Sequence, residues 1–287
     1  MLRIGSIGFG EAAQAFSGGW LAAGASVSAF DVKTRAPDTR SAKQAEYAEQ
    51  EVTGVDSLHE AVVDRDLAFS LVTADQALVA AQQASEGDLG GTLWLDCNSC
   101  APGTKREASA AIARASGRYV DVAVMAPVHP KRHEVPLLLS GPDAETAAGM
   151  LSMLGMRPSV VGDDIGQAST IKMLRSVMIK GTEALFAECF LAARKAGVLE
   201  QVVGSLDGSN PEVRWEVQGC YNLERMLVHG GRRAAEMREV VKTLADLELP
   251  NGLSEATVQW QAQLGQLQLD PGEDELVARL SRVIEAL

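Results

Sequence analysis

Long apolar runs are missing from this 287-residue chain: none reaches the roughly 18 residues that a membrane-spanning helix needs. The first apolar stretch is interrupted by glycines and by Glu11, so it does not resemble a secretory signal peptide. The four cysteines are too few for a disulfide framework. We therefore expect a cytoplasmic protein with reduced thiols and no membrane contact.

Basic residues are also in deficit, with 26 Lys and Arg against 38 Asp and Glu and a formal net charge of -12. Sequence-independent binding of nucleic acid needs a basic surface, so we expect no nucleic-acid partner. Hydrophobic residues at 46% and charged residues at 22% are values typical of globular proteins. The length suffices for two modest domains with a sizeable core.

Short apolar runs alternate with helical patterns through the first half of the chain. Strands are expected at Leu2–Ile7, Ser26–Phe30, Leu67–Val72, Leu93–Asp96, Tyr119–Val124, Pro136–Ser140 and Ser159–Val161. Helices are expected at Glu11–Ala23, Ser57–Val63, Ala74–Ser85, Pro102–Ser116 and Ala144–Leu154. This alternation predicts a mostly parallel sheet that is covered by helices on both faces.

After Gly162 the pattern becomes helical throughout. Asp163 or Asp164 can cap a helix that runs to about Ala196, with Gly197 as its stop. At 1.5 Å per residue such a helix is about 50 Å long, which indicates a bridge between two domains. We expect a Rossmann domain over 1–162 and an all-α domain over 163–287. Further helices are expected near Pro211–His229, Arg232–Leu247, Ser254–Leu264 and Glu273–Leu287.

A glycine-rich turn follows the first expected strand, with the sequence Gly8-Phe9-Gly10-Glu11-Ala12-Ala13. It fits G-x-G-x-x-G/A, in which the first glycine permits a tight turn and the second lets the backbone approach a pyrophosphate. Asp31 ends the second strand, where a carboxylate can bind the ribose hydroxyls, and Val32 and Lys33 follow it. The carboxylate favours NAD, whereas Lys33 and Arg35 leave NADP open.

Three further segments complete a family pattern: Val72-Thr73-Ala74-Asp75, Asp96-Cys97-Asn98-Ser99-Cys100-Ala101-Pro102 and Gly166-Gln167-Ala168-Ser169-Thr170-Ile171-Lys172. With the glycine turn, they resemble the β-hydroxyacid dehydrogenase family, which includes 3-hydroxyisobutyrate and 6-phosphogluconate dehydrogenases. The resemblance implies that the Val72–Asp75 loop lies against the cofactor and that Asn98 and Ser99 contact the nicotinamide ribose and the substrate. It implies that Lys172 is the acid/base. Over the last hundred or so residues the chain resembles an uncharacterised branch of the family.

Two departures from the family pattern bear on the substrate. Ser176 stands where relatives have an asparagine four residues after the lysine. The substrate loop D-x-P-V-S-G-G is replaced by Asp121–Pro127, in which Met125 takes the place of serine and Pro127 has no N–H to offer a carboxylate. A simple short 3-hydroxy acid is therefore not the obvious substrate.

Lys172, Ser176 and Lys180 are spaced i, i+4 and i+8 along one face of the long helix. A lysine serves as acid/base when burial or a neighbouring cation lowers its pKa from about 10.4 toward neutrality. We expect Ser176 to hydrogen-bond the substrate, and Lys180 to contact the substrate or to be the cation beside Lys172. The alternative is that these are ordinary solvated side chains of a helix.

Other candidate site residues have both a functional and a structural interpretation. The basic segment from His129 to His133 either recruits an anionic substrate or is a solvated loop. Arg233 either reaches an active site or pairs with glutamates on its own helix. Cys97 and Cys100 form a C-x-x-C motif without a second pair, so a metal site is not expected and a thiol switch is a minor alternative.

Together these patterns predict an NAD(P)-dependent dehydrogenase or reductase that interconverts a hydroxyl and a carbonyl group on a small hydroxy acid or polyol-like molecule. The long helix and the apolar C-terminal helices favour a homodimer. An imine reductase or an oxidative decarboxylase of the same fold is one alternative. A dinucleotide-binding sensor without turnover is the other.

Overall fold

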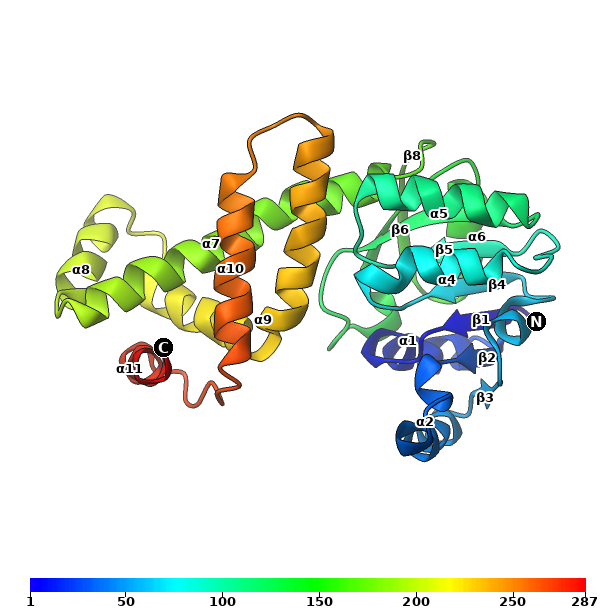
Figure 1. The fold of residues 1–287 in the computed structure, drawn as a ribbon, viewed down its shortest axis with the longest axis horizontal. Helices are drawn as coiled ribbons and strands as arrows, with labels where there is room; N and C mark the ends of the chain where they lie inside the picture. The colour runs from blue at the N-terminus through cyan, green and yellow to red at the C-terminus, as the bar shows by residue number, and fades with distance from the viewer. The chain divides into compact units, whose positions relative to one another are not determined.

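The computed structural model describes residues 1–287, which form two compact units, Met1–Lys172 and Met173–Leu287. The first unit contains a sheet of eight strands, and the second is helical (Figure 1). The fold class expected from the sequence is confirmed. The first unit extends beyond the expected boundary at Gly162 because it includes the first turn of the long helix α7 (Gln167–Lys195), which is hydrogen-bonded to the sheet.

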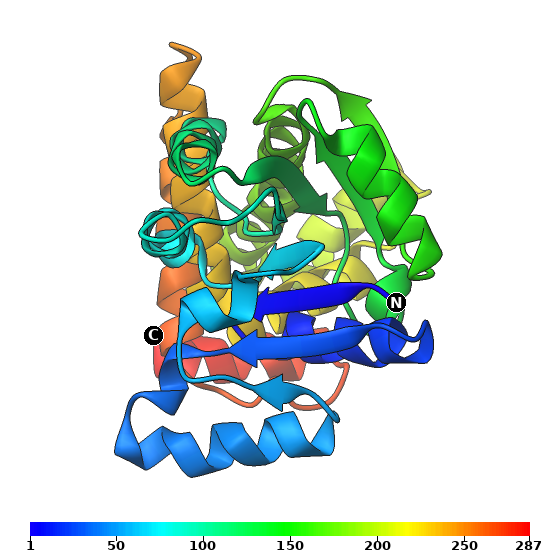
Figure 2. The same ribbon diagram turned by 90° about the vertical axis from the view of Figure 1, so that its right-hand side faces the viewer.

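The sheet has the strand order β3-β2-β1-β4-β5-β6-β7-β8. Its strands are β1 (Arg3–Ile7), β2 (Ser26–Phe30), β3 (Thr53–Gly54), β4 (Leu67–Ser70), β5 (Leu93–Asp96), β6 (Arg118–Val124), β7 (Pro136–Ser140) and β8 (Arg157–Gly162). All neighbouring pairs are parallel except β6 and β7, and Figure 2 shows β1 and β2 in blue running the same way. The carboxyl ends of β1, β2, β4, β5 and β6 therefore meet at one edge.

Helices cover both faces of the sheet and divide its core in two. One core lies under α1 (Glu11–Ala22), α2 (Pro37–Glu49) and α6 (Ala144–Met153) and includes Phe16, Trp20 and Phe69. The other lies under α3 (Leu58–Val62), α4 (Ala77–Ala84) and α5 (Pro102–Arg114) and includes Trp94 and Ile112. This is the doubly covered parallel sheet that the alternating pattern predicted.

The sequence pattern predicts neither α2 nor β3. Helix α2 buries only Lys43 and Tyr47, so it lacks the apolar stripe that identifies an amphipathic helix. Strand β3 has two exposed residues. Helix α2 nevertheless contributes to the site, because it brings the Lys43 side chain against the glycine turn.

The second unit consists of the rest of α7 with α8 (Leu199–Ser209), α9 (Trp215–Asp246), α10 (Gly252–Gln266) and α11 (Leu276–Ala286). Helix α7 stops before Gly197, which has a φ of +73°, as expected. It begins at Gln167, so the expected start after Asp163 or Asp164 is wrong. Helix α8 was not predicted. None of the helices combines the length and the hydropathy needed to cross a lipid bilayer.

The two helices expected over residues 211–229 and 232–247 are one continuous helix, α9. Gly230 and Gly231 do not end it. A Cβ on Gly230 would lie 2.3 Å from the Gln261 carbonyl oxygen and 2.7 Å from the Gly265 Cα of α10. The glycine therefore allows α9 and α10, which stand side by side in Figure 1, to approach closely.

Adjacent glycines on α9 give a matched test of this contact. We expect Gly230→Ala to destabilise the protein by about 1–3 kcal/mol, because the methyl group would overlap backbone atoms of α10. Gly231→Ala should be neutral or stabilise by up to about 1 kcal/mol, since its Cβ would meet no atom within 4 Å and alanine favours helix. Urea unfolding measures both; equal effects would contradict the close packing.

Helix α7 has apolar side chains that are exposed. Ile171, Leu174, Met178 and Leu185 lie on the surface at helical spacing. The homodimer expected from the sequence stays a prediction.

Candidate functional site

The glycine turn follows β1 at the carboxyl edge of the sheet. Gly8 has a φ of +84°, and a Cβ there would lie 2.4 Å from the Leu71 carbonyl oxygen, so the fold itself requires glycine. Gly10 is different: a Cβ on it would meet no protein atom within 4 Å. Gly10 is the N-cap of α1, and no side chain caps that helix. The open face and the helix N-terminus fit the pyrophosphate of a dinucleotide.

Asp31, at the end of β2, holds this turn in place. Its Oδ2 accepts the Phe9 N–H at 2.8 Å, and its Oδ1 accepts the Lys33 N–H at 2.9 Å. Lys43 of α2 donates to the Phe9 carbonyl at 2.8 Å and lies 3.9 Å from Asp31. The carboxylate is buried, while Val32 beyond it is exposed. The predicted cofactor residues of β1 and β2 are thus directly connected.

The loops after β4 and β5 are joined by one side chain. Asn98 is buried, and its Oδ1 accepts the Val72 N–H at 2.8 Å. Its Nδ2 donates to Ser70 Oγ at 2.9 Å and to Asp96 Oδ1 at 2.7 Å. Both amide N–H groups are therefore used, and one lone pair of Oδ1 remains for a ligand. Ser99 beside it is half-buried, and Thr73 and Ala74 follow Val72 at the same edge.

A fully buried charged cluster lies beneath this loop. Lys105 of α5 donates to the Asp96 carbonyl at 2.6 Å and to Asp96 Oδ1 at 3.0 Å, and it lies 3.2 Å from Asp121 Oδ1. Tyr119 donates to Asp96 Oδ2 at 2.7 Å. Burial alone would lower the pKa of Lys105, but Asp96 and Asp121 outweigh it and raise that pKa above its ordinary value. Burial, with these carboxylates, raises the pKa of Tyr119 well above its usual range.

Asp121, near the middle of β6, anchors the first turn of α7. Ser169 donates its N–H to Asp121 Oδ2 at 2.9 Å and its hydroxyl to Oδ1 at 2.6 Å. The Ala168 N–H is bonded to Ser140 Oγ at 3.0 Å. Lys172 is the next residue on the Ser169 face, one turn further along the helix.

Two lysines affect the pKa of the Cys97 thiol, which follows β5. Burial raises the pKa of Cys97 to about 12, and the positive charges of Lys105 and Lys172 both oppose that rise. Lys172 is therefore close enough to act on a thiol at the end of β5. Lys172 follows the turn of α7 that Asp121 holds against β6. Cys97 and Cys100 are both buried, and neither forms a disulfide.

The remaining candidates on the helices have partners in the second unit. Lys180 donates to Ser176 Oγ at 3.1 Å and pairs with Glu236 at 3.0 Å. Arg233 pairs with buried Glu183 at 2.5 Å, to which Gln261 also donates. These contacts give Lys180 and Arg233 structural roles within the helical unit, and their roles toward a substrate stay predictions.

The substrate-loop candidates occupy varied positions. Met125 is half-buried, and its N–H is bonded to the Pro136 carbonyl at 2.9 Å. His129 is exposed, as are Lys131 and Arg132 of the same basic segment. His133 instead packs against α1: a Cβ on Gly19 would lie 2.2 Å from its ring. Part of this segment is thus structural, and recruitment of an anion by the rest stays a prediction.

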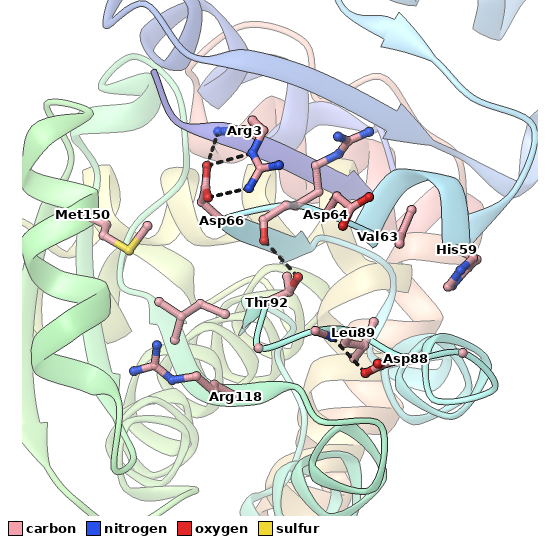
Figure 3. A pocket seen from close by; sticks show the side chains of 15 residues that line it. Arg3, His59, Val63, Asp64, Asp66, Asp88, Leu89, Thr92, Arg118 and Met150 are labelled. Carbon is pink, nitrogen blue, oxygen red and sulfur yellow. Dashed lines mark hydrogen bonds and ion pairs between the residues drawn. The ribbon is translucent and has the colours of Figure 1, made fainter.

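A cavity of about 620 Å³ opens at the opposite edge, where the strands begin (Figure 3). Its cations have partners: Arg3 pairs with Asp66 at 3.0 Å, and Arg118 pairs with Asp143. Parallel sheets with helices on both faces bind ligands beyond the carboxyl ends of their strands. The cofactor site is therefore expected at the edge with the glycine turn and not in this cavity.

Comparison with known proteins identifies the type of the first unit. Residues 3–156 match the NAD binding domain of 6-phosphogluconate dehydrogenase, and residues 193–264 match a domain of unknown function, DUF1932. A conserved hypothetical protein from Sinorhizobium meliloti 1021 is 35% identical to this chain, with a TM-score of 0.80. The match covers 100% of this chain and 97% of that protein.

Two more distant structures share the fold. Mycobacterium tuberculosis 3-hydroxyisobutyrate dehydrogenase is 16% identical with a TM-score of 0.74, covering 99% of each chain. An imine reductase from Myxococcus stipitatus is 20% identical with a TM-score of 0.60, covering 98% of each chain. The chain has a 6-phosphogluconate dehydrogenase-type domain that binds a nicotinamide dinucleotide, and a helical second unit follows it. This chain belongs to the β-hydroxyacid dehydrogenase family.

Proposed function

We propose that the protein is an NAD(P)-dependent oxidoreductase that interconverts a hydroxyl and a carbonyl group on a small hydroxy acid or polyol-like molecule. Lys172 is its acid/base. The observation that carries the proposal is the first turn of α7, which Asp121 and Ser140 bind to the sheet. This anchoring supports a place for Lys172 beside the Asn98–Ser99 loop, at the edge that bears the dinucleotide turn.

The dinucleotide, when bound, accepts or supplies the hydride. The chain's own residues handle the proton and the orientation of the substrate. Lys172 takes the hydroxyl proton in the oxidative direction and returns it to the carbonyl oxygen in reduction. The Ser99 hydroxyl and the remaining Asn98 Oδ1 lone pair are suited to orient the substrate. Ser176, one turn after Lys172, is proposed to extend this polar face.

The proposed cofactor is NAD. Asp31 lies at the end of β2, and its negative charge would repel a 2′-phosphate, although Lys43 lies 3.9 Å away. Fluorescence titration with NADH and NADPH tests the choice. We expect NADH to bind more tightly, by about tenfold or more, and tighter binding of NADPH would reverse the assignment.

Imine reduction is the second candidate, because an imine reductase shares the fold. Retention of a lysine at position 172 favours carbonyl–alcohol chemistry over it. Oxidative decarboxylation needs an anchored carboxylate, and Pro127 in the substrate loop has no N–H to donate. A sensor without turnover is the remaining alternative.

The deciding experiment follows dinucleotide absorbance at 340 nm with the wild-type protein. One panel contains 3-hydroxy acids and polyols with NAD⁺ and NADP⁺, and the other contains the matching carbonyl compounds and cyclic imines with NADH and NADPH. Turnover of hydroxyl or carbonyl compounds would support the proposal. Turnover of imines alone would favour the imine reductase. Tight dinucleotide binding without any turnover would favour the sensor.

A further inference from the structure

Lys105 takes no part in the proposed chemistry, yet it is among the largest fully buried side chains in the protein. Lysine is almost never fully buried unless it is paired, because removing an ammonium group from water is costly. Lys105 meets this condition through two carboxylates, Asp96 and Asp121. The role of the ammonium group at this position on α5 therefore depends on those two carboxylates.

Asp96 and Asp121 are register partners on the neighbouring parallel strands β5 and β6. Two like charges at adjacent positions repel each other. Lys105 lies 3.0 Å from Asp96 Oδ1 and 3.2 Å from Asp121 Oδ1, so one ammonium group bridges both. The three side chains carry two negative charges and one positive charge, a net charge of -1.

Each of the two carboxylates holds a different half of the proposed site. Asp96 Oδ1 accepts the Asn98 N–H at 3.0 Å and the Asn98 side chain at 2.7 Å. Asp121 accepts both the N–H and the hydroxyl of Ser169, at the turn that precedes Lys172. Lys105 is the direct link between these two sets of hydrogen bonds.

We propose that Lys105 is a positioning residue that keeps the Asn98–Ser99 loop in register with the first turn of α7 and hence with Lys172. The proposal rests on the proposed function for its kinetic consequence, but the structural link can be tested without a substrate. Loss of the bridge leaves two adjacent carboxylates that move apart, and the loop and the helix turn move with them.

The test is Lys105→Met, which keeps the length of the side chain and removes its charge, with Arg114→Met as the control on the exposed side of the same helix. Hydrogen exchange should accelerate about tenfold or more over residues 97–101 and 166–172 and stay unchanged over residues 3–22. With a substrate in hand, kcat should fall about 10–100-fold while dinucleotide affinity changes less than about twofold. Arg114→Met should show none of these effects.

Unchanged hydrogen exchange in folded Lys105→Met would overturn the proposal. Faster exchange spread evenly over residues 1–172 would also overturn it, because it would indicate a general structural role for Lys105. These readouts decide the matter even if the wild type turns over nothing, which would count against the proposed function alone. If Lys105→Met does not fold, the double variant Lys105→Met/Asp121→Asn restores the net charge of -1. We expect it to fold with native exchange over residues 97–101, because Asp96 then faces no second carboxylate; fast exchange there would overturn the proposal.

Discussion

Lys172→Ala is expected to lower kcat by about 10²–10⁴-fold and to leave dinucleotide affinity nearly unchanged. The side chain is proposed to transfer the substrate proton, whereas the dinucleotide contacts lie on the turn after β1 and at Asp31. Steady-state kinetics and fluorescence titration measure the two effects separately. A fall in affinity that matches the fall in kcat/KM would contradict an acid/base role.

Two matched variants sharpen that result. Lys172→Arg keeps the positive charge but cannot release its proton near neutral pH, so it should be as impaired as the alanine variant. Recovery of activity in Lys172→Arg would mean that Lys172 supplies only charge. Lys195→Ala removes an exposed lysine from the last turn of the same helix and should retain wild-type kinetics.

Gly10→Ala is expected to weaken dinucleotide binding by about 100-fold or more without unfolding the protein. No protein atom lies within 4 Å of the added methyl group, and a φ of -93° suits alanine. The cost to folding is limited to the poorer N-cap, about 1 kcal/mol. The methyl group instead occupies the surface that a pyrophosphate approaches. Titration with NADH and thermal unfolding measure binding and stability.

Gly8→Ala provides the contrast, because it stands two residues earlier in the same turn. Its φ of +84° and its contact with Leu71 make alanine strained, so this variant should lose stability first. If Gly10→Ala binds the dinucleotide as the wild type does, the open face of Gly10 is not the pyrophosphate site. If it unfolds like Gly8→Ala, the two glycines do not have separate roles.

Sequence periodicity predicted most of the elements that bury apolar side chains, with α8 as an exception, and it missed α2 and β3, which bury few or none. The strands at Ser26–Phe30, Leu93–Asp96 and Pro136–Ser140 were predicted with their observed bounds. Helix α2 was missed because its buried residues are Lys43 and Tyr47. Two helices were expected where α9 is continuous through Gly230, since a single sequence does not show that α10 packs against this glycine.

The site shows the same division between local and long-range information. The glycine turn, Asp31 and the lysine of α7 stand in motifs whose spacing is local, so the sequence was sufficient to propose them. Lys105 has no such motif: its role depends on β5 and β6 being neighbours, which only the folded sheet establishes. Asn98 was predicted as a ligand contact, but its hydrogen bonds to Val72 and Ser70 were not foreseeable.

The hydrogen bonds around Phe9 have a consequence for how the cofactor binds. Asp31 accepts the Phe9 N–H, and Lys43 and Gln14 donate to the Phe9 carbonyl oxygen. The turn is therefore rigid before any ligand binds. The conformational entropy of ordering the turn is lost during folding and not during association. Dinucleotide capture should therefore proceed in a single kinetic phase, and its rate should rise linearly with ligand concentration instead of levelling off at the speed of a loop rearrangement.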